Sequence, residues 1–143
     1  MTERHKTQEA PAYREYERFR DWVHTLERFR LGEAITDLSG YMAADMVVAF
    51  KEENFTNPLH RATFRAIRAL RTRGARDLDV GMVIGEMQHQ GTFSEFPNAT
   101  SYVCSLTEGS VPPPTRASRL FRLHEIAWAW AELERAKKEA VSG

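Results

Sequence analysis

Cysteine, secretion signals and long apolar runs are scarce or missing in this sequence, and each absence excludes a class of protein. The only cysteine is Cys104, so an intramolecular disulfide is excluded and a reducing compartment is expected. The longest apolar runs, MVVAF and IAWAWA, are far shorter than the roughly 20 residues that cross a bilayer. The first residues, MTERHKTQEAP, contain no apolar segment of a secretion signal. We therefore expect a cytoplasmic protein without a membrane partner.

Motifs of catalysis and of metal binding are also missing. The phosphate-binding pattern GxxxxGK[ST] does not occur, and the histidines are scattered without a carboxylate at helical ligand spacing. Cys104 follows Val103 and has no basic neighbour, so we predict a buried apolar side chain rather than a reactive thiolate. The sequence therefore predicts no catalytic residue, no cofactor and no metal site, and a protein that is not an enzyme.

The charged residues are balanced overall but unevenly distributed. Twenty basic and twenty acidic residues cancel, so any attraction to nucleic acid has to come from a local patch. Residues 61–76 carry six arginines and no acid, whereas the segments 31–60 and 77–108 are net acidic. Two interpretations remain open for the principal residues of this row, Arg61, Arg65, Arg68 and Arg71. They either form a solvated helix face that meets acidic groups of this chain or of a neighbour, or they contact DNA phosphates.

Helical periodicity runs through the sequence, and no segment alternates apolar and polar residues over the length of a strand. An all-α fold is therefore predicted. We expect a flexible N-terminus, an amphipathic helix, a helical head, a proline-rich connector and a long C-terminal helix. Their ranges are 1–11, 12–30, 31–108, 109–115 and 116–143. The connector contains three consecutive prolines, which no helix accommodates.

Within the head, turn and capping residues divide the chain into shorter helices. The pair Ser39 and Gly40 separates LGEAITDL from YMAADMVVAFKEE, which we expect to be two helices. The pair Asn57 and Pro58 is typical of a helix start, and Gly74 of the end of the same helix. Asp79 is expected to begin a further helix that ends at Gly91.

Both terminal helices carry apolar edges that are too broad for a small head to cover. The predicted interface residues are Phe19, Trp22, Val23 and Leu26 in the N-terminal helix, and Leu123, Ile126, Trp130 and Leu133 in the C-terminal helix. Exposed apolar surface of this extent marks an interaction site, so we expect a homo-oligomer, either a dimer or a larger assembly. The alternative is that these side chains form the core of a monomer.

The residues from Leu31 to about Arg135 follow an order known from a protein family. The segment ENFTNPLHRATFRAIRALRTRGARDLDVGMVIGEMQHQGTF has an acid before a Phe, a Pro turn, a His-Arg pair and Gly or Asp at helix ends. The matching residues are Glu53, Phe55, Pro58, His60, Arg61, Phe64, Ala66, Ile67, Leu70, Gly74, Asp79, Val83 and Gly91. A short helix with Tyr102, Val103 and Leu106 and the exit SVPPP follow. In these features the chain resembles the N-terminal domain of the DnaB-type replicative DNA helicase.

The resemblance implies a compact helical head with an extended helical arm, which serves to assemble a hexamer and to dock primase. In that family this domain does no chemistry, and the ATP-dependent motor is a separate domain without a counterpart among these residues. The second arm of the family has no counterpart either, and we expect the N-terminal helix to replace it, within the chain or across a dimer. The predicted function is a non-catalytic protein-interaction module of the primosome in DNA replication, with primase or a replicative helicase subunit as partner. The alternative is a small DNA-binding protein that uses the arginines of residues 61–76 on phosphates.

Overall fold

The computed structural model describes residues 11–142, and within this range every regular element is helical. The α-helices are α2 (Pro11–Thr36), α3 (Tyr41–Ala49), α4 (Pro58–Thr72), α5 (Val80–His89), α6 (Thr92–Glu95), α7 (Ala99–Leu106) and α8 (Arg116–Ser142). A short 3-10 helix, η1, spans Glu52–Asn54. The predicted all-α fold is confirmed. The predicted flexible N-terminus lies outside the described residues, except for Pro11, which begins α2.

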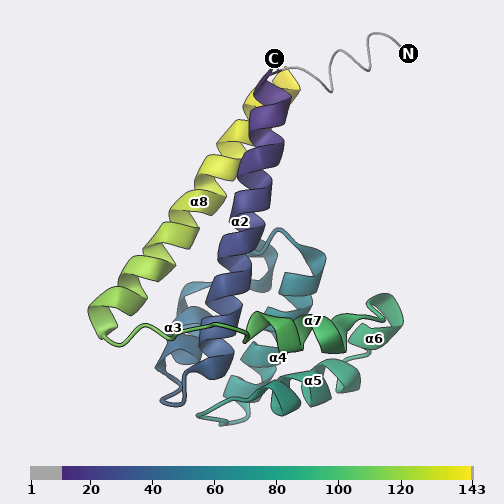
Figure 1. Ribbon diagram of the computed structural model, residues 1–143, viewed down its shortest axis with the longest axis vertical. Helices are drawn as coiled ribbons and strands as arrows, with labels where there is room; N and C mark the ends of the chain where they lie inside the picture. Colours follow the sequence, from purple (N-terminus) through teal and green to yellow (C-terminus); the bar gives the residue numbers. More distant parts are fainter. Residues whose placement is uncertain (1–10, 143) are drawn as a thin grey trace.

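The helices form a head and an arm. Figure 1 shows α2 and α8 running antiparallel, with the beginning of α2 and the end of α8 together at the tip of the arm. The shorter helices α3 to α7 surround the C-terminal end of α2 and make up the head (Figure 1). The connector after α7 crosses the head and leads to the beginning of α8 (Figure 1). The two terminal helices are therefore partners within one chain.

Helix α2 is longer than predicted, because the expected separate helix LGEAITDL is its last part. Leu31, Ala34 and Ile35 continue the buried face of α2 into the head. Gly32 does not interrupt the helix, and its lack of a side chain is used for packing. A Cβ atom on Gly32 would lie 2.1 Å from the carbonyl oxygen of Leu106, so α2 can approach the end of α7 only with glycine here.

The predicted break at Ser39 and Gly40 is confirmed. One carboxylate oxygen of Asp37 accepts hydrogen bonds from the backbone nitrogen and hydroxyl of Ser39, and the other accepts from the backbone nitrogen of Met42 at 2.9 Å. Gly40 has a φ of 76°, and a Cβ there would lie 1.8 Å from the carbonyl oxygen of Arg76. The next helix, α3, ends at Ala49, earlier than the predicted stretch that ran to residue 53.

The capping residues of α4 and α5 act as predicted. The side chain of Asn57 accepts hydrogen bonds from the first turn of α4, which begins at Pro58. At the other end Gly74, with a φ of 96°, follows the helix and its nitrogen donates to the carbonyl of Arg71. Asp79 accepts from the backbone nitrogen of Met82 at 2.8 Å and caps α5.

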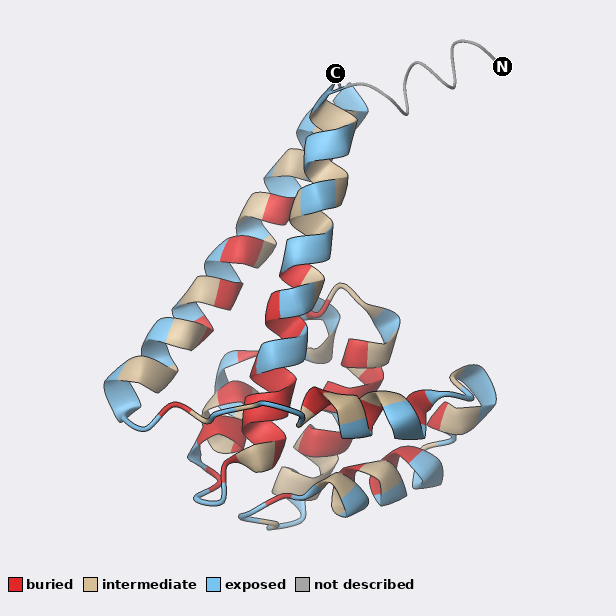
Figure 2. Cartoon of the chain, in the orientation of Figure 1, coloured by how far each residue is buried: buried red, intermediate tan, exposed pale blue. Residues whose placement is uncertain are grey.

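The core lies where the base of α2 meets the head, and Figure 2 shows buried residues concentrated there. Its largest fully buried side chains include Phe55, Phe64, Leu31 and Ile67. The prediction that Cys104 is buried was wrong, because this side chain is exposed. On α7 the inward positions belong to Val103 and its neighbours one turn apart, and a residue next to Val103 points about 100° away from it.

Candidate functional site: the two-helix arm and the network at its base

The seam between α2 and α8 consists of residues that were predicted to contact a partner. Val23, Leu26, Leu123, Ile126 and Leu133 are all buried within this single chain. The small residue Ala129 is also buried and lets the two helices approach. For these five residues the prediction of an interface with another molecule needs correction, because they are core residues of the arm. Their heptad spacing required a second helix, and α2 and α8 supply it for each other.

The other three predicted interface residues have different environments. Phe19 and Trp130 are half-buried against the core, so neither presents a full surface to a partner. The Trp130 ring packs edge-on against Phe50 and Phe55, with ring centroids 4.9 and 5.0 Å apart. Only Trp22 remains exposed. The broad apolar edges are therefore mostly, but not completely, covered by the chain itself.

A carboxylate buried at the base of the arm collects hydrogen bonds from several elements. Glu27 of α2 is 0% exposed. Its oxygens accept from the backbone nitrogen and the hydroxyl of Thr56, both at 2.8 Å, and from the nitrogen of Asn57. They also bond to Nδ1 of His60 at 2.8 Å and accept from the indole nitrogen of Trp130 at 2.8 Å. This one side chain thus connects α2 with the start of α4 and with α8.

The hydrogen bonds decide the charge state of Glu27. Burial by itself would raise the pKa of this carboxyl group, but the hydrogen bonds from His60, Thr56 and Trp130 outweigh burial and lower the pKa below its usual value. Close by, burial lowers the pKa of His24, whose ring packs edge-on against His60. Glu27 is therefore an ionised acceptor, as five donors around one carboxylate require.

The same network reaches α7 through a chain of three side chains. The second ring nitrogen of His60 bonds to the Tyr102 hydroxyl, so Glu27, His60 and Tyr102 form an acid, imidazole and hydroxyl in sequence. Such an order activates a nucleophile in some enzymes. Here burial raises the pKa of the Tyr102 phenol, which opposes activation. The arrangement fits a structural connection between the arm and the head better than a reactive centre.

A second polar cluster joins the two helices of the arm near the head. Arg30 donates to Glu33 in α2 at 2.7 and 3.2 Å, and to Glu125 of α8 at 3.3 Å. Arg122 of α8 donates to Oε2 of Glu33, the oxygen that also accepts from Arg30, and to the carbonyl of Val111 at 3.2 Å. Since Arg30 and Glu33 are buried, their charges depend on each other, and the cluster fixes the register of α2 against α8.

The arm carries four exposed aromatic residues, two on each helix, which we call the outer aromatic face. They are Trp22 and Phe29 on α2 and Phe121 and Trp128 on α8, exposed by 39%, 51%, 68% and 55%. On each helix the two residues are seven apart and so project from one stripe. Phe19 joins the two stripes, because its ring contacts both Trp22 and Trp128, with centroids 5.3 and 6.4 Å apart.

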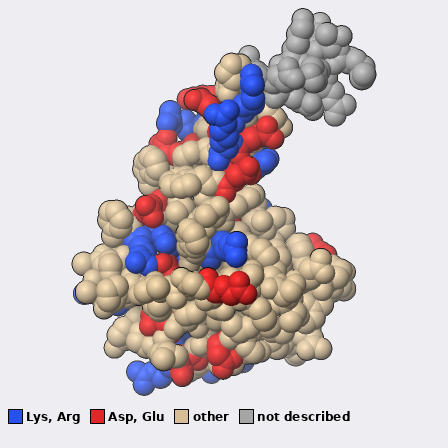
Figure 3. All heavy atoms as spheres, viewed as in Figure 1, with Lys and Arg blue, Asp and Glu red and all other residues tan. Residues whose placement is uncertain are grey.

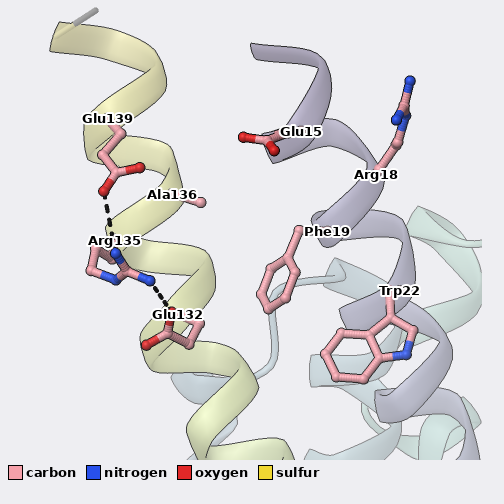
Figure 4. Close-up of a pocket in the computed structure, with 8 residues that line it drawn as sticks. All are labelled: Glu15, Arg18, Phe19, Trp22, Glu132, Arg135, Ala136 and Glu139. Atoms are coloured by element: carbon pink, nitrogen blue, oxygen red, sulfur yellow. Dashed lines mark hydrogen bonds and ion pairs between the residues drawn. The ribbon is translucent and has the colours of Figure 1, made fainter. Parts of the chain in front are cut away.

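A groove continues the outer aromatic face toward the tip of the arm. It has a volume of 430 Å³ and is lined by Phe19, Trp22 and Ala136 together with the charged residues Glu15, Arg18, Glu132, Arg135 and Glu139. Figure 4 shows Glu15 and Phe19 pointing toward α8, Arg18 pointing away from it, and Arg135 between two glutamates of its own helix. The groove therefore combines an apolar floor with a rim that carries both signs of charge.

The arginine row of α4 is bonded largely within the chain. Arg61 donates to the carbonyl oxygens of Phe55 at 2.7 Å and of Thr56 at 3.3 Å. Arg65 and Arg68 share the carboxylate of Glu52, each at 3.0 Å, on the outside of the head. Two further arginines of the segment are also engaged: Arg71 donates to the carbonyls of Ala75 and Arg76, and Arg73 pairs with Glu86. These contacts are those of a solvated face with internal ion pairs.

Sequence reasoning missed the centre of the network at the base of the arm. Glu27 and His60 are 33 positions apart in the chain, and His60 and Tyr102 are 42 apart, so no local motif connects them. The available signal was the position of Glu27, which directly follows Leu26 on the apolar seam of α2. A carboxylate next to a buried apolar seam is expected to be buried as well, and it then needs hydrogen-bond donors from the protein to replace water.

Among residues 11–142 no group of three or more histidines, cysteines or acids is arranged to hold a metal ion. No helix in the same range combines the length and the apolar character needed to cross a membrane. Comparison of the chain with protein-family models, with curated proteins and with solved structures found no match in any of the three.

Proposed function

We propose that this chain is a non-catalytic protein-interaction module of DNA replication that binds a helical partner through its arm. The observation that carries the proposal is the outer aromatic face, Trp22, Phe29, Phe121 and Trp128. Tryptophan and phenylalanine are enriched at the centres of protein interfaces and give up much apolar surface when covered. Trp22 and Trp128 are linked through the Phe19 ring, and Phe29 and Phe121 lie seven residues further along the same helices, so the four are not singly scattered exposed residues.

The arrangement of charges supports a protein as the bound molecule. Figure 3 shows acidic and basic groups gathered at the tip and at the base of the arm, with mostly uncharged surface between them. An apolar centre with a polar rim is the usual composition of a protein interface. A nucleic-acid surface would instead require an excess of positive charge, and the chain has none.

The replication context follows from the resemblance to the N-terminal domain of DnaB-type helicases. A helical head with a two-helix arm is the plan that this resemblance implies, with α2 in the place of the family's second arm. The proposed partners are accordingly a primase or a replicative helicase subunit, and self-assembly accompanies this role. A DNA-binding role has less support, because Arg61, Arg65, Arg68 and Arg71 are engaged with groups of their own chain.

Calorimetric titration with purified primase and purified replicative helicase from the same organism tests the proposal. We expect the chain to bind at least one of them, and Trp128→Glu to weaken that affinity by at least about tenfold, because an interface aromatic is replaced by a charge. The matched control is Val48→Glu on α3, where an equally apolar residue is exposed on the head rather than on the arm. Absence of binding to both proteins, or equal binding by Trp128→Glu, contradicts the proposal.

A further inference from the structure

The groove at the tip of the arm specifies the chemistry of the partner, and this step rests on the proposed interaction function. We infer that the groove receives a basic amphipathic helix of a partner protein, whose lysine or arginine side chains lie above Trp22 and beside Glu15. The aromatic floor of the groove then covers the apolar stem of such a side chain, and the acidic rim faces its positive charge.

Acidic groups outnumber basic ones among the side chains that face the groove. Three glutamates line it, Glu15, Glu132 and Glu139, together with the arginines Arg18 and Arg135. Arg18 points away from α8, whereas Glu15 points toward it (Figure 4). Three carboxylates therefore face one guanidinium, which leaves a surplus of two negative charges. A positively charged segment complements this surplus, and an acidic helix or a DNA strand would be repelled by it.

Glu15 is the carboxylate of the groove that is most available to a partner. Glu132 and Glu139 both pair with Arg135 on their own helix. Glu15 is exposed, and it has no ion pair with any of the groove residues drawn in Figure 4. A cation that enters the groove therefore meets a carboxylate that the other groove residues do not neutralise, and the two can form a charge-assisted hydrogen bond.

The floor of the groove is aromatic, and aromatic faces attract cations. Trp22 is 39% exposed, and the Phe19 ring lies beside it with centroids 5.3 Å apart. An ammonium or guanidinium group above an aromatic face is attracted by the negative charge of the π system, most strongly at tryptophan. The methylene stem of lysine or arginine adds apolar contact along the same floor. A basic side chain thus uses both the floor and the rim.

The position of the groove indicates a helix as its occupant. The groove lies between α2 and α8, which run antiparallel along the arm (Figure 1). Phe19 lines the groove and also contacts the Trp128 ring of the outer aromatic face, with centroids 6.4 Å apart. Apolar surface therefore continues from the groove along the arm. An amphipathic helix laid along such a surface places apolar residues on the aromatics at intervals of three or four, with its basic residues at the rim.

Two synthetic helical peptides test the inference without knowledge of the natural partner. Both carry leucine at every third or fourth position and a covalent staple that keeps them helical, and they differ only in having lysine or glutamate beside the leucines. Calorimetric titration should give a dissociation constant at least about tenfold lower for the lysine peptide, and added salt should reduce this difference. Equal affinities, or the absence of binding by both peptides, overturn the inference.

Charge reversal at Glu15 tests whether the groove is the binding site. Glu15→Lys should weaken binding of the lysine peptide by at least about tenfold, because it replaces the available carboxylate with a like charge. The matched control is Glu134→Lys, which changes the net charge equally at an exposed position of α8 outside the groove. Far-ultraviolet circular dichroism checks that both variants keep their helices. Equal losses of affinity in the two variants overturn the assignment to the groove.

Carbodiimide crosslinking locates the contact independently. This reagent joins an amine to a carboxylate with which it is in contact, so it should couple a lysine of the peptide to Glu15. Mass spectrometry of the digested product should find this crosslink, and little coupling at the exposed Glu134. Equal coupling at the two glutamates contradicts binding in the groove.

The outcomes for the groove and for the proposed function are separable. If primase or helicase binds and is weakened by Trp128→Glu but not by Glu15→Lys, the groove inference is overturned and the proposed function remains. If the lysine peptide binds selectively but neither replication protein binds, the groove inference is supported and the replication role is refuted. Both proposals are supported together only when a replication protein binds and both substitutions weaken it.

Discussion

Aromatic residues lie on both sides of the arm, but on one side they pack against the core and on the other they are exposed to solvent. Two tryptophans of α8 show this difference directly. Trp130 lies on the side toward the head, where it packs against Phe50 and Phe55 and donates to the buried carboxylate of Glu27. Trp128, two positions earlier, is more than half exposed on the outer side. The difference teaches that aromatic content alone does not mark an interface, since only the side without a cover is available to a partner.

The largest effect is expected at the centre of the inner side. Glu27→Ala removes the acceptor of five hydrogen bonds from Thr56, Asn57, His60 and Trp130, and leaves the buried His60 ring without this partner. We expect a loss of about 3 to 5 kcal/mol in the free energy of unfolding, as for other buried polar networks that lose one member. Urea denaturation followed by circular dichroism measures the loss.

The matched control for this change is Glu139→Ala, which removes a carboxylate from the exposed tip of the arm. Its effect should stay below about 1 kcal/mol, because it breaks only a surface ion pair with Arg135. If the two substitutions cost the same, the network around Glu27 does not hold the arm to the head.

The tryptophan pair gives the next largest difference. Trp130→Ala should cost about 3 kcal/mol of unfolding free energy, because it empties an aromatic contact and removes a donor from Glu27. Trp128→Ala should change the stability of the monomer by less than about 1 kcal/mol, since more than half of this residue is already exposed to solvent. Urea denaturation of both variants at concentrations low enough to prevent association makes the comparison. Equal losses would show that both tryptophans are core residues.

How far the sequence predicts this arrangement can be followed at individual residues. The periodicity of Leu123, Ile126 and Leu133 correctly indicates a long helix that needs another helix beside it. The periodicity does not indicate which molecule provides the second helix. A heptad seam has the same residue spacing whether it packs against α2 of the same chain or against a helix of another molecule. The first residues of α4 and α5 are predicted closely, since Asn57 and Asp79 cap these helices by accepting hydrogen bonds from backbone nitrogens two or three positions later in the sequence.

The network at the base of the arm was not predictable in the same way. The contacts among Glu27, His60 and Tyr102 depend on how three helices pack against each other. The local sequence around each of these residues does not indicate that the other two lie next to it. The error at Cys104 has a similar origin. Cys104 lies between the buried residues Val103 and Leu106 in the sequence, which suggests that it is buried too. Its side chain, however, projects from α7 in a different direction and is exposed.

The pH dependence of stability provides a smaller and more specific test of the inner side. Burial lowers the pKa of His24 in the folded chain below its ordinary value of 6.5. The unfolded chain therefore takes up the proton first, so the stabilising contribution is complete above about pH 6.5 and is lost as the pH falls through the lowered pKa of the folded state. The pKa of Glu27 is also lowered, which adds a further loss of stability at pH values below the ordinary carboxyl pKa of 4.5.

Unfolding free energies between pH 7.5 and about pH 5 should therefore decrease as the solution becomes more acidic. His24→Gln should flatten this part of the curve, because the group that titrates is gone. The same substitution at His89, at the end of α5 on the far side of the head from the arm, is the control. A slope that His24→Gln leaves unchanged contradicts a role for His24 beside the network.

The smallest effect is expected on the outside of the head, where the arginine row meets solvent. Arg65 and Arg68 are exposed by 45% and 40% in their side chains, and they share one carboxylate, that of Glu52. Replacing both by Gln should change the free energy of unfolding by less than about 1 kcal/mol, because exposed ion pairs contribute little.

The same double variant tests whether these arginines bind DNA. If they contact phosphates, duplex affinity falls steeply with salt, by a log-log slope of about 0.9 per contact, and the variant reduces that slope. We expect instead that duplex binding is weak, and that binding of primase or helicase is the same for the variant and the wild type. A steep salt dependence that disappears in the variant would show that the functional binding surface is α4 rather than the arm.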